Sequence, residues 1–236
     1  MSSAAGTPRQ FQPVIAQYPG DRSVTGGGVA IFHLATSRVV ICSAIESGMK
    51  YYFLPKGRRD AGEESGPGAE REGYEESGYR NRLLPLPIKH RQPQAYPRVH
   101  AAPMTAEPVW MQLMPLRDWQ YVIYWYIAET LPPDLEAELE TEVGAAYKPP
   151  PRYPKDLPLR ERIKLEPGGY EPLHHENTGV DALEVTFKSH LVSVEEAITK
   201  LGRNSVMADV VRKGWEGIQN RLAIEDAATS TSPDAM

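Results

Sequence analysis

An arginine and three glutamates fall within the six residues 71–76, behind a glycine-rich turn. Gly66-Pro67 is a suitable helix start, because proline in the first turn loses no helical hydrogen bond, and Gly78 is a suitable helix end. A helix between them places Glu72, Glu75 and Glu76 at positions i, i+3 and i+4, on one face. The sequence therefore predicts a short helix that presents three carboxylates together.

Such a helix has little to stabilise it by itself. Arg71 can pair with Glu75 at i+4, but the other two glutamates have no partner of this kind within the segment. The apolar face consists mainly of Ala69 and Tyr74, and Gly73 costs roughly 1 kcal/mol relative to alanine. A hard divalent cation would offset the repulsion, because Mg²⁺ binds carboxylate oxygens and keeps positions for water and phosphate oxygens. The stretch therefore indicates a metal site.

The charged residues and glycines of this stretch also have a characteristic spacing. They are Gly57, Glu63, Arg71, Glu72, Glu75, Glu76 and Gly78, followed by Tyr79. This spacing resembles the Nudix box, in which a glycine, a glutamate, an Arg-Glu pair, a Glu-Glu pair and a glycine recur at the same offsets. Gly73 is the one departure, since the family has a bulky apolar residue there. Without the flanking glycines and Glu63, the charge run alone would be typical of a solvated helix face.

The resemblance implies an α+β Nudix fold, in which a mixed β-sheet lies between helices and the box forms a loop, a helix and a loop. It implies a hydrolase of phosphorus-containing acid anhydrides that cleaves a diphosphate linked to another group with Mg²⁺ or Mn²⁺. The implied metal ligands are Glu72, Glu75, Glu76 and the backbone carbonyl of Gly57. Glu63 would be a further ligand or would orient the site through water.

The resemblance leaves two roles to assign. Arg71 is expected to hold the carboxylates in place. The group that takes the proton from water stays open among Glu72, Glu76 and a carboxylate from a later segment, Glu129. For Glu129 the competing interpretation is an exposed residue at a strand end.

Substrate selection is expected from basic residues outside the box. The candidates are Lys56, Arg58 and Arg59 before it, and Lys89, His90 and Arg91 after it. Together they would form a cationic rim for a polyphosphorylated metabolite; the competing interpretation is ordinary surface charge. The PKGR form at 55–58 is similar to that in Nudix enzymes acting on diadenosine polyphosphates and diphosphoinositol polyphosphates. The alternatives are hydrolysis of ADP-ribose, a nucleotide-sugar or an isoprenoid diphosphate, and a non-catalytic module that binds a phosphorylated metabolite.

The composition limits the partners. With a net charge of −5 and a pI near 5.7, the chain has no general attraction for nucleic acid or an anionic membrane. The single cysteine, Cys42, lies in an apolar run and indicates a buried thiol, so no oxidising compartment is required. No apolar run approaches the ~18 residues of a membrane span. We expect a soluble protein of the cytoplasm, or also the nucleus, with no prediction of its oligomeric state.

Hydrophobic patterning predicts one domain at 12–225, between disordered tails at 1–11 and 226–236. Strands are expected at 12–18, 29–34, 39–45, 51–58, 107–114, 121–130 and 182–190. In the strand at 121–130, Tyr124 and Tyr126 should share one face and Trp125 the other. Residues 131–180 are expected to be an insertion, with a short acidic helix near its start and His174-His175 on a loop surface. A capping box at 193–196 should begin a helix to Leu201, and a last helix is expected at 205–222.

Overall fold

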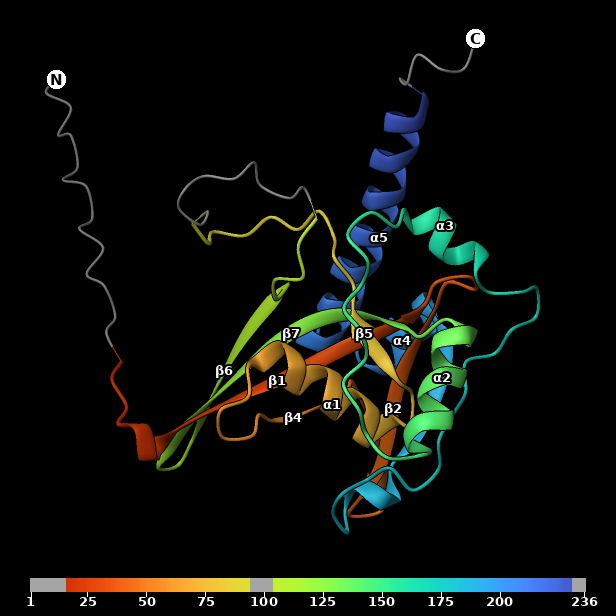
Figure 1. Cartoon of the computed structure of the whole chain (residues 1–236). Helices are drawn as coiled ribbons and strands as arrows, with labels where there is room; N and C mark the ends of the chain where they lie inside the picture. Colours follow the sequence, from red (N-terminus) through yellow and green to blue (C-terminus); the bar gives the residue numbers. More distant parts are fainter. Residues whose placement is uncertain (1–15, 94–103, 231–236) are drawn as a thin grey trace, which may run out of the picture.

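The computed structural model describes residues 16–93 and 104–230, and within them a mixed sheet lies between helices (Figure 1). The strands are β1 (Ser23–His33), β2 (Arg38–Glu46), β3 (Met49–Phe53), β4 (Lys56–Arg58), β5 (Asn81–Leu83), β6 (Trp110–Leu116), β7 (Trp119–Thr130) and β8 (Lys188–Ser193). The helices are α1 (Ser65–Ser77), α2 (Pro133–Val143), α3 (Leu159–Lys164), α4 (Val194–Lys200) and α5 (Val206–Ser230). Two 3₁₀ turns, η1 (Gly20–Arg22) and η2 (Glu184–Thr186), complete the described elements. The predicted α+β class is confirmed.

Strand β1 is the centre of the sheet. The order is β3-β2-β1-β7-β5, with β4 paired to β1, β6 to β7 and β8 to β2. β1 runs parallel to β7 over ten residue pairs, and the other pairings are antiparallel. Residues 29–32 of β1 are fully buried, because helices cover both faces of the sheet at this point.

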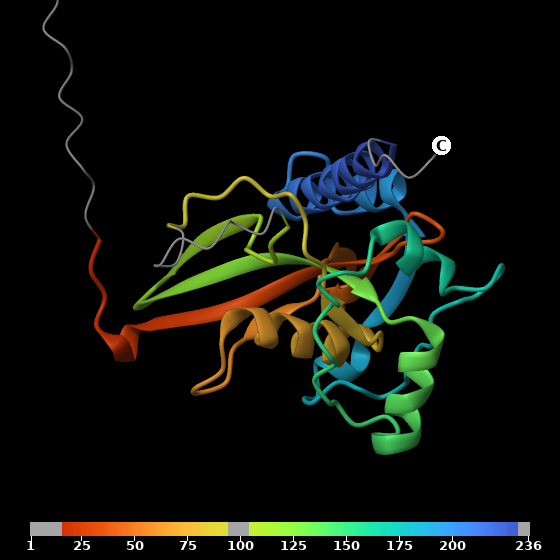
Figure 2. The same ribbon diagram turned by 45° about the horizontal axis from the view of Figure 1, so that its top comes forward.

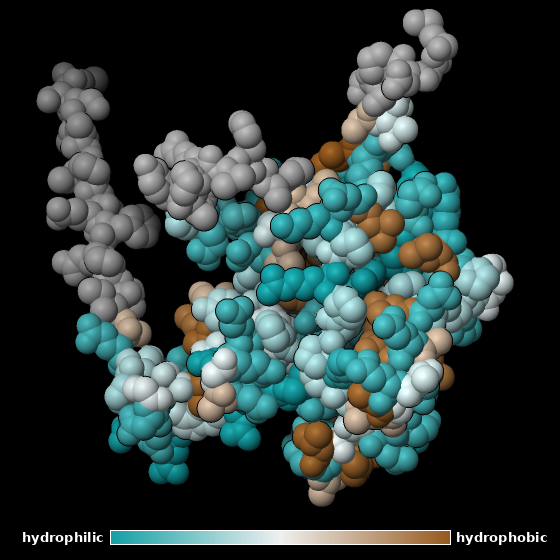
Figure 3. Space-filling model, viewed as in Figure 1, coloured by the Kyte–Doolittle hydropathy of each residue, from teal (hydrophilic) through white to brown (hydrophobic). Residues whose placement is uncertain are grey.

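The two faces of the sheet carry separate cores. On one face, Phe32, Trp125 and Ile127 pack against α4 and α5; on the other, Tyr126 and Ala128 pack with Ala69 of α1. Figure 2 shows α4 and α5 on one side of the sheet and α1 on the other. The predicted alternation of residues 124–126 is therefore confirmed. On the face visible in Figure 3, apolar side chains form separate groups among hydrophilic ones.

Several predicted elements change their bounds. The strand at 51–58 is divided between β3 and β4, which pair with different neighbours. Residues 16–18 of the predicted first strand are not in a strand, and residues 12–15 lie outside the described part of the chain, as does the tail at 1–11. Helix α5 continues through residues 226–230 of the predicted C-terminal tail. The other residues of that tail, 231–236, lie outside the described part of the chain.

The strand prediction for 182–190 is wrong over residues 182–187. Asp181 accepts hydrogen bonds from the backbone N–H groups of Leu183 (2.7 Å) and Glu184 (2.9 Å), and this side-chain cap turns the chain into η2. Strand β8 begins only at Lys188. The predicted N-cap at Ser193 is confirmed, since its side chain accepts a hydrogen bond from the Glu196 N–H at 3.3 Å, which is one of the two hydrogen bonds of a capping box.

The segment 131–180 packs on the rest of the fold. The acidic helix is confirmed as α2, whereas α3 was not predicted. Tyr153 and Leu159 are buried in the core on the α5 side. Arg162 of α3 is fully buried beside Glu129 and Glu166. Both an apolar and an ionic contact therefore hold this segment against the sheet.

Candidate metal and phosphate site

Helix α1 has nearly the predicted bounds. It follows Glu64 and ends where Gly78 adopts φ 72°, with the Gly78 N–H donating to the Tyr74 carbonyl at 2.7 Å. A left-handed residue at this position is a common helix end and favours glycine. Ala69 and Tyr74 are buried, as the sequence predicts.

The structure explains the glycine at position 73. A Cβ there would lie 2.7 Å from Nδ2 of Asn81 and 2.8 Å from Cγ1 of Val29, both closer than a carbon normally approaches. The space that a bulky residue would fill is thus already taken by β1 and β5. The departure from the box pattern is compensated by these neighbours, so the helix can still pack against the sheet.

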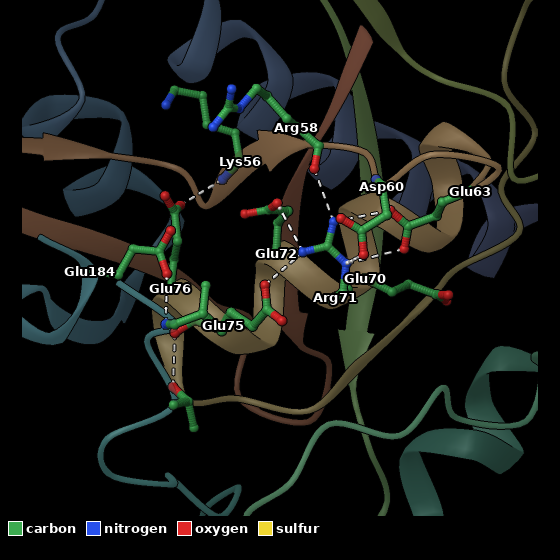
Figure 4. Close-up of polar contacts among 12 residues, drawn as sticks. Lys56, Arg58, Asp60, Glu63, Glu70, Arg71, Glu72, Glu75, Glu76 and Glu184 are labelled. Carbon is green, nitrogen blue, oxygen red and sulfur yellow. Dashed lines mark hydrogen bonds and ion pairs between the residues drawn. The ribbon is translucent and has the colours of Figure 1, made fainter. Parts of the chain in front are cut away.

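Three carboxylates converge beside β4. Glu72 and Glu76 of α1 and Glu184 of η2 each place an oxygen within 4.8 Å of the others. Figure 4 shows Glu184 beside Glu76, and the backbone N–H of Lys56 donating to Oε2 of Glu76 at 2.7 Å. A Cβ on Gly57 would overlap the Glu72 carboxylate, so a larger residue at this position would displace that carboxylate. We call these three residues the carboxylate cluster.

Arg71 connects the box to the preceding loop. Its guanidinium contacts Glu63 at 3.0 Å, Glu72 at 3.0 Å and Glu75 at 2.7 Å, and it donates to the Arg58 carbonyl at 2.9 Å (Figure 4). The expected i+4 pair with Glu75 is present, and Arg71 also contacts Glu72, the next residue along the chain. Glu75 is turned toward Arg71 and does not belong to the carboxylate cluster.

Burial makes the cluster costly without a cation. It raises the pKa of Glu72 to about 7 and that of Glu76 to about 8, although Arg71 and Lys56 act in the opposite direction. Three converging carboxylate oxygens, two of them from buried side chains that are costly to ionise without a partner, suit a hard divalent ion. The residues present therefore fit Mg²⁺ or Mn²⁺.

The basic residues predicted as a rim separate into two groups. Lys56 and Arg58 lie on β4 next to the carboxylate cluster (Figure 4), whereas Arg59 donates to the Glu63 carbonyl at 2.8 Å and so closes the loop. Lys89 and Arg91 are on an exposed segment that follows Ile88, which packs into the core on the α5 side. No contact joins those two residues to the cluster in the described part of the chain.

Glu129 lies elsewhere. Its side chain is fully buried and contacts Arg82 at 2.6 Å and Arg162 at 2.8 Å. It has the same strand parity as Trp125 and Ile127, and so it lies on the face of the sheet opposite α1. Both hypotheses for this residue, the general base and the exposed strand end, are therefore wrong.

A second acidic group contains one of the paired histidines. Glu136, Glu140 and His175 converge, but Nη1 of Arg80 lies 2.7, 3.1 and 3.0 Å from them and occupies the space between. His175 is buried rather than on a loop surface, which corrects the prediction for that residue. The arrangement is an ion-pair network that ties α2 to the end of α1.

Two residues near the site were not found from the sequence. Glu184 lies far from the box along the chain and in no recognisable motif. Tyr121 on β7 has its hydroxyl against Gly26 of β1, and burial, followed by the charges of Glu72 and Glu76, raises its pKa to about 12. Alternation along 121–130 would have been the only signal for Tyr121.

No helix among the described residues has the length and apolar character needed to cross a bilayer.

Comparison with known proteins yields structural neighbours only. No protein-family model matches the chain, and no curated protein matches it. The chain is similar to a NUDIX hydrolase from Nitrosomonas europaea, with 12% identity over 81% of this chain and 87% of that one, at a TM-score of 0.42. It is also similar to an Ap4A hydrolase from C. elegans, with 12% identity over 87% of this chain and 98% of that one, at a TM-score of 0.39. A third similar structure is a MutT protein from Methanosarcina mazei Go1, with 10% identity over 84% of this chain and 94% of that one, at a TM-score of 0.38.

Proposed function

We propose that the protein is a divalent-metal-dependent pyrophosphohydrolase that cleaves a diphosphate linked to another group. The observation that carries this proposal is the convergence of Glu72, Glu76 and Glu184 within 4.8 Å beside β4. The resemblance of residues 57–79 to the Nudix box supports it independently of the side-chain geometry. A bound Mg²⁺ or Mn²⁺ would neutralise diphosphate charge and acidify water.

The chain's own residues would position the reactants. Arg71 holds Glu72 and Glu75 through its guanidinium, so the carboxylates keep their arrangement when no cation is bound. The Lys56 N–H fixes the carboxylate of Glu76. Glu72, Glu76 and Glu184 are the acids close enough to one another to accept a proton from a water held between them.

The proposed substrates are diphosphoinositol polyphosphates or diadenosine polyphosphates. The backbone of β4 borders the carboxylate cluster, whereas the side chains of Lys56 and Arg58 extend from the other side of this strand (Figure 4), so they would contact phosphates that reach past β4. A rim of positive charge favours multiply phosphorylated compounds over an isoprenoid diphosphate, whose tail needs an apolar wall. Within the rim, Arg59 would act by closing the loop rather than by contacting substrate.

A substrate panel tests the proposal. The protein is incubated with Mg²⁺ and diphosphoinositol polyphosphates, diadenosine polyphosphates, ADP-ribose, a nucleotide-sugar or an isoprenoid diphosphate, and released phosphate or nucleotide is measured. Glu76→Gln and Glu184→Gln should reduce kcat roughly a hundredfold or more, because each removes a charged group that acts at the reacting centre. Glu138→Gln, on the exposed side of α2, is the matched control and should keep full activity.

The outcomes separate the competing functions. Turnover of the polyphosphates that the cluster variants lose supports the proposal. Turnover of only ADP-ribose, a nucleotide-sugar or an isoprenoid diphosphate would keep the hydrolase and reject the substrate class. Binding of Mg²⁺ and a phosphorylated compound without turnover would instead identify a non-catalytic binding module.

A further inference from the structure

A group of cations lies on the face of the sheet opposite α1, where β3, β2 and β8 meet. Ser43 of β2 pairs with Tyr52 on one side and with Lys188 on the other, so these three side chains form one row. Lys50 and His190 are two residues away along their strands and project from the same face. We call Lys50, Lys188 and Lys200 of α4, together with Tyr52, Ser43 and His190, the lysine face.

Short contacts bring these groups together. The Lys200 ammonium is 3.4 Å from the Tyr52 hydroxyl, and the Lys50 and Lys200 ammonium groups lie 4.9 and 4.7 Å from the centre of the Tyr52 ring. Nε2 of His190 is 2.9 Å from Oγ of Ser43. Hydrogen bonds from Lys50 and Lys200 lower the pKa of Tyr52, as expected where positive charge is concentrated. Three strands and one helix thus direct polar groups to one place.

This positive charge is not neutralised locally. Among the described residues, Lys50 and Lys188 form no ion pair, and Lys200 has a single acidic partner, Glu196, at 3.5 Å. Burial lowers the pKa of His190, and the nearby lysines lower it further, so the imidazole is a neutral hydrogen-bonding group. On a chain with a net charge of −5, an excess of cations confined to one face needs an explanation.

We propose that the lysine face binds a multiply phosphorylated small molecule. Three compact ammonium groups and a phenol hydroxyl supply the donors that phosphate oxygens accept. The row from β3 to β8 spans two inter-strand spacings, roughly 10 Å, which fits a small polyphosphate and is too short for the repeated contacts of a nucleic-acid strand.

This site is distinct from the carboxylate cluster. Cys42, the residue before Ser43, points to the opposite face, where its thiol contacts the Glu76 carbonyl at 3.5 Å. The sheet therefore separates the two sites. The proposal does not depend on the hydrolase activity, and its ligand could come from a soluble metabolite or from a lipid headgroup with the same phosphate chemistry.

Calorimetric titration in the absence of divalent metal tests whether the lysine face binds a polyphosphate. The full chain is titrated with inorganic tripolyphosphate in EDTA, where the carboxylate cluster is uncompensated and repels anions. Lys50→Ala and Lys188→Ala should each weaken binding about tenfold, as the loss of one charge-assisted contact implies. Lys164→Ala is the matched control, because that lysine is exposed on α3 and pairs with Glu161 at 2.7 Å; it should bind like the parent.

A second arm identifies the source of the phosphate. Vesicles of phosphatidylcholine containing one-tenth phosphatidylinositol bisphosphate replace tripolyphosphate, and co-sedimentation of each variant is measured. Binding to either probe that depends on Lys50 and Lys188 supports the proposal, and the probe that binds tells which source is used. Binding to neither probe, or binding that Lys50→Ala and Lys188→Ala leave unchanged, overturns it.

Discussion

Arg162 joins α3 to the ends of two central strands, and its replacement by methionine is the most direct test of how residues 131–180 are held. The side chain is fully buried. Nε lies 2.8 Å from Oε2 of Glu129, and Nη2 lies 2.9 Å from Oε1 of Glu166 and donates to the Thr130 carbonyl at 2.8 Å. Methionine fills a similar space but leaves two buried carboxylates with one partner fewer.

The loss of stability in Arg162→Met depends on the partners that Glu129 and Glu166 keep. Removing one partner of a buried ion pair lowers the free energy of unfolding by roughly 3–5 kcal/mol, because the other charge stays desolvated. Here Glu129 keeps Arg82 at 2.6 Å and Glu166 keeps His33 at 3.1 Å. Among the residues that the structure describes, Nη1 of Arg162 has no hydrogen-bond partner, and the Nε contact is close without being aligned as a hydrogen bond. We therefore expect the lower end, about 3 kcal/mol, or a fall in Tm of roughly 6–12 °C for a chain of this size.

Chemical denaturation with a matched control measures this cost. Arg160 is on the same helix, but its pair with Asp226 is on the surface, so Arg160→Met should leave the free energy of unfolding almost unchanged. A difference below about 1 kcal/mol between the two variants would refute the reasoning, because a free-energy cost from burial should separate them.

The same contact predicts a pH dependence. Burial acts to raise the pKa of Glu166, but the hydrogen bond with His33 and the charge of Arg162 outweigh it, so the pKa lies below its usual value of 4.5. A carboxyl with a depressed folded-state pKa stabilises the fold above the unfolded pKa, and this stability is lost as the pH falls through the folded value. Arg162→Met loses this depression of the Glu166 pKa, so the stability difference between the parent and the variant, measured by urea unfolding at successive pH values, should shrink as the pH falls below about 4.5.

Two further predictions concern the box. Mg²⁺ affinity measured by calorimetry should rise between about pH 6 and pH 9 and then level off, because Glu72 and Glu76 have pKa values of about 7 and about 8 and must lose their protons to bind a cation; affinity that is constant over this range would contradict it. Gly73→Leu should destabilise the fold by roughly 1–3 kcal/mol in urea unfolding, because its side chain would collide with Val29 and Asn81; a gain in stability would show that the space can be filled.

Local signals accounted for most of helix α1. Its end at Gly78 and its buried residues depend on backbone preferences and on spacing within a few turns, which the sequence contains. These local signals could not predict which glutamates of α1 would join the carboxylate cluster and which would turn to Arg71. Glu75 turns to Arg71 because that guanidinium is also fixed by Glu63 and the Arg58 carbonyl from the preceding loop. Helical spacing alone treated Glu72 and Glu75 as equivalent.

Long-range contacts account for what the sequence did not reveal. Glu184 reaches the carboxylate cluster only because Asp181 turns the chain before β8, and the apolar residues nearby had favoured a continuous strand. The burial of Arg162 depends on Glu129 of β7 and on Glu166, which follows the end of α3. A charged helix in an irregular segment is usually interpreted as surface, and only the tertiary contacts make this one part of the interior.

The error at Glu129 shows which information was missing. Alternation along 121–130 correctly separated Tyr126 from Trp125, and the same parity assigns Glu129 to the side of Trp125. That assignment alone does not say which face of the sheet α1 covers. Gly27 of β1 determines the face, because a Cβ there would lie 2.7 Å from the Ala69 N and would keep α1 from approaching on the Tyr126 side. The glycine run 26–28 precedes the predicted strand at 29–34 but lies within β1, and its Gly27 lets α1 cover the face of the sheet on which the carboxylates meet.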